Sequence, residues 1–120
     1  MVEVPIVVSW ESSGEEGEKE KISFQTIVRL SVQEAVSHLR LKSGEAKNRV
    51  TLLRSFASSV AARFKGAIQE RAERKLIRVS GKVDAGDFEE ILETLAREGL
   101  VVEAEPPKYV KQRVKYWRLA

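Results

Sequence analysis

The segment Ile22–Leu39, ISFQTIVRLSVQEAVSHL, contains a change from strand to helix. Ile22–Leu30 is rich in β-branched and apolar residues, which predicts a strand. Ser31 fits a helix N-cap, and Glu34 three residues later completes a capping box. A short helix is therefore expected over Val32–Leu39. A strand that leads directly into a capped helix indicates a fold that mixes the two elements.

A strand and a polar connection precede this segment. Val4–Trp10, VPIVVSW, is β-branched and apolar and predicts a strand, with Pro5 marking a strand start or an edge position. Glu11–Lys21 carries two glycines and five glutamates. Such a composition is typical of a loop or of a hairpin connection.

A long helix is predicted after the Ile22–Leu39 segment, over Gly44–Glu73, with Ser43 as the N-cap. Glu45 and Arg49 have the spacing of a favourable ion pair on one helix face. Apolar residues recur at three- and four-residue steps, so they share one side of the helix. They are Val50, Leu53, Ala57, Val60, Phe64 and Ile68.

The C-terminal half predicts a strand, a helix and a final pair of strands. Asp84 or Asp87 opens the helix, Gly99 ends it, and Gly81 is expected to form a bulge or turn. The whole chain, residues 1–120, is then one α+β domain, in which an antiparallel sheet of about four to five strands packs with one long and two shorter helices. The four C-terminal elements are Lys75–Val83, Phe88–Glu98, Leu100–Glu103 and Gln112–Leu119.

Charge is distributed unevenly. The net charge is +3, yet residues 40–82 carry +9, residues 83–107 carry −7 and residues 108–120 carry +5. This segregation can build a basic surface beside an acidic one, or the segments can neutralise each other within the fold. No apolar run is long enough to span a bilayer, so a cytoplasmic protein without membrane contact is expected. There is no Cys, so no disulfide is expected. The single Met, the single Asn and the many charged residues resemble a thermophile's composition.

Enzymatic chemistry has little support in the sequence. His38 is the one histidine and has no recognisable catalytic partner by spacing. The glycines form no phosphate-binding or dinucleotide-binding pattern. The acids at Asp84 and Asp87 suit a helix start, which accounts for them without a metal ion. We therefore expect no catalytic residue, no metal and no cofactor.

The tail Lys108–Ala120, KYVKQRVKYWRLA, points to nucleic acid. It contains five Lys or Arg, three aromatic residues and no acid. Cations bind phosphates and aromatic rings stack on unpaired bases. In a strand, Trp117 and Leu119 lie on one face and Tyr116 and Arg118 on the other, so neither face is cleanly apolar. The alternative is that Trp117 and Leu119 belong to the core and the basic residues protect a sheet edge.

A second basic cluster lies in the Arg40–Arg54 segment, where a helix start would add backbone donors for a phosphate. An ordinary solvated helix start is the alternative. Trp10 is a further aromatic candidate, for base stacking or for the core. The candidate nucleic-acid-binding residues are Trp10, Arg40, Lys42, Lys47, Arg49, Arg54, Lys108, Tyr109, Lys111, Arg113, Lys115, Tyr116, Trp117 and Arg118.

Small residues follow one another at four-residue steps on the long helix, at Ser58, Ala62 and Gly66. Small side chains allow another backbone to approach closely. This lane is the candidate contact of a homo-oligomer, a dimer or tetramer. The alternatives are a nucleic-acid strand or an acidic partner, and a second buried helix face within the monomer or dimer.

Phe88–Ala120 resembles the second half of a winged-helix domain. A helix ending in AREGLV is followed by a strand, a turn at PPKYVK and a returning strand RVKYWRL. The segment before it, KLIRVSGKVDAGD, reads as a strand and loop, where a helix-turn-helix has a short helix and a tight turn. The resemblance implies a binder of duplex DNA.

In the order of its elements the whole chain is similar to the archaeal ThermoDBP-related single-stranded DNA-binding proteins. The similarity rests on the VVSWE strand, the acidic connection, the capped long helix and the basic, aromatic closing strand. It implies an oligomeric α+β protein that binds single-stranded DNA at the basic and aromatic positions of Arg40–Arg54 and Lys108–Arg118. We expect single-stranded DNA, or RNA, to be bound with little sequence specificity. The alternatives are the duplex binder and an oligomeric adaptor.

Overall fold

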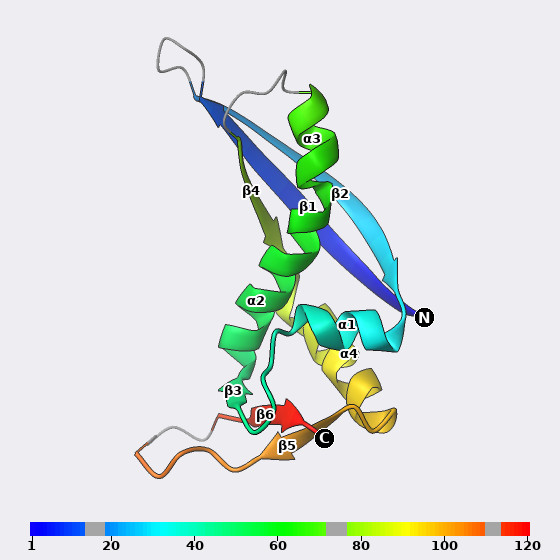
Figure 1. Cartoon of the computed structure of the whole chain (residues 1–120), viewed down its shortest axis with the longest axis vertical. Coiled ribbons are helices and arrows are strands. Elements are labelled where there is room, and N and C mark those ends of the chain that lie inside the picture. Colours follow the sequence, from blue (N-terminus) through cyan, green and yellow to red (C-terminus); the bar gives the residue numbers. More distant parts are fainter. Residues whose placement is uncertain (14–18, 72–76, 110–113) are drawn as a thin grey trace.

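The computed structural model describes residues 1–13, 19–71, 77–109 and 114–120 (Figure 1). Two three-stranded antiparallel sheets and several helices make up this part of the chain, which confirms the α+β class. The expected single sheet is wrong, because the strands divide between two sheets. The elements are β1 (Val2–Ser13), β2 (Lys19–Leu30), α1 (Val32–His38), β3 (Ala46–Asn48), α2 (Arg49–Ala61), η1 (Ala62–Phe64), α3 (Lys65–Arg71), β4 (Ile77–Lys82), α4 (Ala85–Arg97), β5 (Val101–Ala104) and β6 (Tyr116–Leu119).

The larger sheet has the strand order β2-β1-β4, with β1 in the middle. β1 and β2 pair over their full lengths, so the two predicted strands are confirmed and extend further than expected. Side chains alternate across a strand. The odd-numbered residues of β1 from Glu3 to Glu11 face away from the core and are exposed or half-buried. The even-numbered residues that the core buries are Val2, Val4, Ile6 and Val8.

The long helix begins at Arg49, and Asn48 is its N-cap. The Thr51 N–H donates a hydrogen bond to the Asn48 Oδ1 at 2.8 Å. The predicted start at Gly44 with Ser43 as cap is wrong, because residues 46–48 are extended and pair with β6. From Arg49 the chain continues through α2, η1 and α3 as one long ridge beside the larger sheet (Figure 1).

The buried face of this ridge is turned relative to the predicted one. Leu52 and Phe56 are fully buried, whereas Val50 is 51% exposed and Leu53 is half-buried. Three of the predicted core residues are buried as expected: Ala57, Val60 and Ile68.

Gly81 allows α2 to lie close to β4. A Cβ at this position would stand 2.5 Å from the Ala57 carbonyl oxygen and 2.7 Å from the Ala61 Cβ. The register of β4 against β1 runs without interruption through Gly81. The predicted bulge or turn is therefore wrong, and the glycine marks a close approach between helix and strand.

The shorter helices have the caps that their local sequences predict, although α4 begins at Ala85 and not at Phe88. The Ser31 hydroxyl accepts a hydrogen bond from the Glu34 N–H, and the Glu34 side chain accepts one from the Ser31 N–H, which completes the capping box. Asp84 caps α4, and Gly99 after it has a φ of 74°. The buried face of α4 meets α2 in the core, where Phe56 and Phe88 lie 5.3 Å apart between ring centroids.

The smaller sheet has the order β3-β6-β5. It lies at one end of the molecule, beside the start of α2 and the end of α4, while the connected ends of β1 and β2 lie at the other end (Figure 1). The predicted final strand pair is confirmed, since β5 pairs with β6. None of the described helices has both the length and the apolar character needed to cross a membrane.

Candidate nucleic-acid interface

The smaller sheet brings two distant basic segments together. In the antiparallel register of β3 and β6, Ala46 lies opposite Arg118, Lys47 opposite Trp117 and Asn48 opposite Tyr116. The tail is therefore joined, strand to strand, to the Arg40–Arg54 segment.

The two faces of β6 differ in burial. Leu119 lies opposite Val101, which is 1% exposed, so this face is directed at the core. Trp117 shares that face, is half-buried and packs against the core cluster. Arg118 is exposed and Tyr116 is half-buried on the other face. The Trp117 ring thus packs between the sheet and the core, and the Tyr116 ring lies on the side of the sheet directed away from the core.

Exposed cations and an aromatic ring flank the sheet. Tyr109 is 85% exposed, and Lys108 and Lys115 are exposed on either side of the β5–β6 connection. Among the described residues, neither lysine lies within ion-pair distance of an acid. The predicted site residues Lys111 and Arg113 lie outside the residues that the structure describes.

Two of the predicted phosphate-binding cations are paired with acids. The Lys47 Nζ lies 3.0 Å from the Glu45 carboxylate, and the Arg49 guanidinium lies 3.4 Å from Glu89 of α4. The predicted Glu45–Arg49 pair does not form, because Glu45 precedes the helix and belongs to the turn before β3. The Arg49–Glu89 pair is exposed and exposed ion pairs are weak, so a phosphate could displace Glu89.

Arg40 has a strained backbone. It follows the C-terminus of α1 with a φ of 55°, in the left-handed region that favours glycine. For a residue with a Cβ, this conformation costs roughly 1–2 kcal/mol. Its side chain is exposed, as is that of Lys42 in the same loop.

Trp10 does not join the surface around β6. Trp10 lies opposite Ile22 and Val79 in the larger sheet, on its core-facing side, and packs against the core. That end of β1 is far from β6 (Figure 1). Arg54 is exposed further along α2.

The small-residue lane is exposed along the same ridge, at Ser58, Ala62 and Gly66. It is therefore not a second buried face of this monomer.

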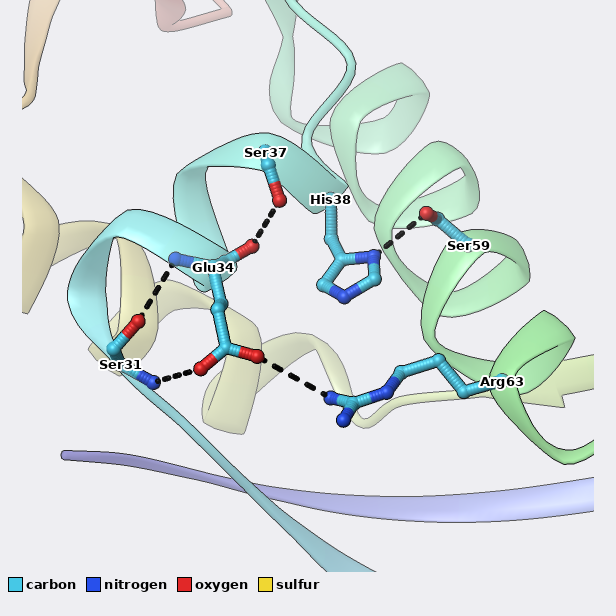
Figure 2. Close-up of polar contacts among 6 residues, drawn as sticks. All are labelled: Ser31, Glu34, Ser37, His38, Ser59 and Arg63. Atoms are coloured by element: carbon cyan, nitrogen blue, oxygen red, sulfur yellow. Dashed lines mark hydrogen bonds and ion pairs between the residues drawn. The ribbon is translucent and has the colours of Figure 1, made fainter.

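His38 takes part in a polar network that ties α1 to α2 and to η1 (Figure 2). Its Nδ1 lies 2.7 Å from the Ser59 Oγ, and the Glu34 carboxylate lies 3.9 Å from the Arg63 guanidinium. Burial lowers the pKa of His38, and the positive charge of Arg63 lowers it further. The hydrogen bond from the Ser31 backbone lowers the pKa of Glu34. These contacts give the network a structural role in joining the two helices.

Unfolding free energy is expected to fall as the pH drops below about 6.5, the ordinary pKa of histidine. The pKa of His38 is lower in the folded chain than in the unfolded chain, so the unfolded chain takes up the proton first. The stabilisation that comes from holding His38 neutral is complete above pH 6.5 and is lost as the pH falls toward the pKa of His38 in the folded chain. Urea titrations between pH 8 and pH 5 measure this slope, and the variant His38→Gln should flatten it. Equal slopes in the two proteins would contradict the assignment to His38.

The sequence left open whether Trp10 and Trp117 face the core or bind bases, and in the structure both pack against the core. Alternation along β6 was readable, but the face that meets the core depends on β5 and on the helices packed against the sheet.

Among the described residues, no three His, Asp or Glu side chains come together as a metal site. No family model, curated protein or solved structure matches this chain.

Proposed function

We propose that this chain binds single-stranded DNA with little sequence specificity at the smaller sheet. The supporting observation is the pairing of β3 with β6, which joins the basic loop before β3 to the basic, aromatic tail. The basic-aromatic surface is defined as Lys42, Lys108, Tyr109, Lys115, Tyr116 and Arg118. Its cations would contact phosphates, and its two tyrosine rings would stack on unpaired bases.

The strain at Arg40 supports a role for charge beside this surface. Glycine would adopt the same backbone conformation without the steric cost. The chain instead holds an exposed arginine there, directly before the loop that leads to β3. A residue kept at a conformational cost is a candidate for function. We infer that Arg40 contributes a further phosphate contact.

Duplex DNA is the second candidate, because α4 is followed by the paired strands β5 and β6 as in a winged-helix domain. In that arrangement α4 would enter a groove lined by phosphates. Its exposed side includes Glu89, Glu90 and Glu93, which would be repelled there. The negative charge on α4 therefore favours a single strand over a duplex as the ligand. An adaptor that binds another protein is the remaining alternative.

The proposal includes a homo-oligomer, dimer or tetramer, in the cytoplasm. The exposed lane of Ser58, Ala62 and Gly66 is its candidate contact. RNA is a second possible ligand of the same surface, since the contacts proposed are to phosphates and base faces, which RNA shares with DNA.

Removing cations from the basic-aromatic surface is expected to weaken the salt dependence of binding. Each lost phosphate contact lowers the slope of log affinity against log salt by about 0.7 for a single strand. Lys115→Ala and Arg118→Ala should each show this change, and Lys21→Ala on the larger sheet should not. Fluorescence anisotropy of a labelled oligothymidylate over a salt series measures the slopes. If Lys21→Ala changes the slope as much as Lys115→Ala, the contacts are diffuse and the proposed surface is wrong.

A further inference from the structure

The first half of β1 has an open edge. β4 pairs with β1 only over residues 7–12, so among the described strands β2 is the one partner of residues 2–6. Pro5 lies in this stretch, and proline in a strand occupies a position where an N–H would face away from the partner. The N–H and C=O of Glu3 and the C=O of Pro5 therefore face the open edge, where a further strand could pair with them, while Pro5 has no N–H to donate.

A trough runs along this edge. One hollow of about 570 Å³ lies over β1 and β2 beside the start of α4, and another of about 290 Å³ lies between β1 and α4. Both are lined by Pro5 and Asp87, so they are neighbours, and together they are called the trough. Val7 and Ile27 line the larger hollow, and Ile27 is 58% exposed. The trough thus offers apolar surface next to unpaired backbone.

The wall of the trough is acidic. α4 and its N-cap contribute Asp84, Asp87 and Glu90, and Lys82 is the one cation among the lining residues. Glu3 also lines the trough, although it pairs with Arg29 at 3.5 Å. This excess of negative charge repels nucleic acid and attracts a cationic chain.

We propose that the trough binds an extended, basic segment of a partner protein, which adds to the edge of β1 as a further strand. Backbone pairing would supply affinity, and alternate side chains would supply specificity. One set of side chains would lie over Val7 and Ile27 and be apolar. The other set would face Asp87 and Glu90 and be Lys or Arg. This surface is separate from the basic-aromatic surface and does not depend on it.

The test uses a labelled nine-residue peptide that alternates Lys and Val, with three comparisons. In the first comparison peptide Glu replaces Lys, and in the second alternate backbone nitrogens are methylated, which prevents strand pairing. The third is the pair of variants Glu90→Lys and Glu93→Lys, because both residues are exposed on α4 but only Glu90 lines the trough. Anisotropy measures affinity, and amide chemical shifts locate the peptide.

We expect the Lys peptide to bind the full chain and shift amides of β1, and Glu90→Lys to weaken it at least fivefold. Glu93→Lys and Arg118→Ala should change its affinity less than twofold, and the Glu and methylated peptides should bind at least tenfold more weakly. Equal binding of the methylated peptide, or equal loss in both glutamate variants, would overturn strand addition. Shifts of the β1 amides by oligothymidylate would assign the trough to nucleic acid and overturn the proposal. A dimer that Glu90→Lys dissociates, together with no binding of the peptide, would assign the trough to a second copy of the chain and also overturn it.

Discussion

Replacing Gly81 by valine is expected to lower the free energy of unfolding by about 3 kcal/mol, at the upper end of the usual cost of overpacking a core. The first added carbon would stand 2.5 Å from the Ala57 carbonyl oxygen, which belongs to the backbone of α2 and cannot move aside as a flexible side chain can. Either α2 or β4 must shift, and both contribute to the same core. Urea denaturation of the two proteins measures the difference.

Gly66 provides the matched control. It lies on the exposed side of α3, and a Cβ added there meets no atom within 4 Å. Gly66→Ala should raise the free energy of unfolding by about 1 kcal/mol, through helix propensity. Substitutions of two glycines would then act in opposite directions. A change below 0.5 kcal/mol for Gly81→Val, on the order of an ordinary surface substitution, would contradict the close approach of helix and strand.

Removing the rings of Tyr109 and Tyr116 is expected to cost the most affinity for single-stranded DNA. Base stacking on an aromatic ring contributes roughly 1–3 kcal/mol per base. Tyr109→Ala and Tyr116→Leu should therefore each weaken binding about tenfold or more, and the double variant about a hundredfold. The slope against salt should not change, because neither tyrosine contributes a positive charge. Leucine at position 116 retains apolar volume in the half-buried site.

Tyr109→Phe and Tyr116→Phe separate stacking from hydrogen bonding. Both retain a ring, so both should bind within about twofold of the original chain if stacking is the interaction. Circular dichroism checks that the double variant keeps its fold. If that variant is folded and binds with unchanged affinity, the tyrosines do not contact bases and the aromatic part of the proposal fails.

Local capping chemistry made part of this fold predictable. The Ser31–Glu34 box, the Asp84 cap and the Gly99 terminus each depend on a few neighbouring residues, so the sequence alone indicates them. Strands β1 and β2 were also readable from their β-branched composition. In each case the interaction that forms the element lies within the element or next to it.

Long-range pairing determined the features that the sequence did not reveal. Ser43 and Gly44 look like a helix start, but residues 46–48 pair with β6 near the end of the chain, so the helix begins at Arg49. Gly81 has the local signature of a turn, and only the position of α2 explains it. The same holds for the candidate site. Its basic and aromatic composition was evident, whereas the core-facing side of Trp117 depends on β5 and the helices.

The central claim is tested most directly by comparing single-stranded and duplex oligonucleotides of matched sequence in an anisotropy titration with the full chain, over a salt series. We expect at least tenfold tighter binding of the single strand at every salt concentration, and a log affinity that falls linearly with log salt because phosphates are contacted. Similar affinities for single strands of different sequence should accompany it. Tighter binding of the duplex, or binding of neither at low salt, would contradict the account.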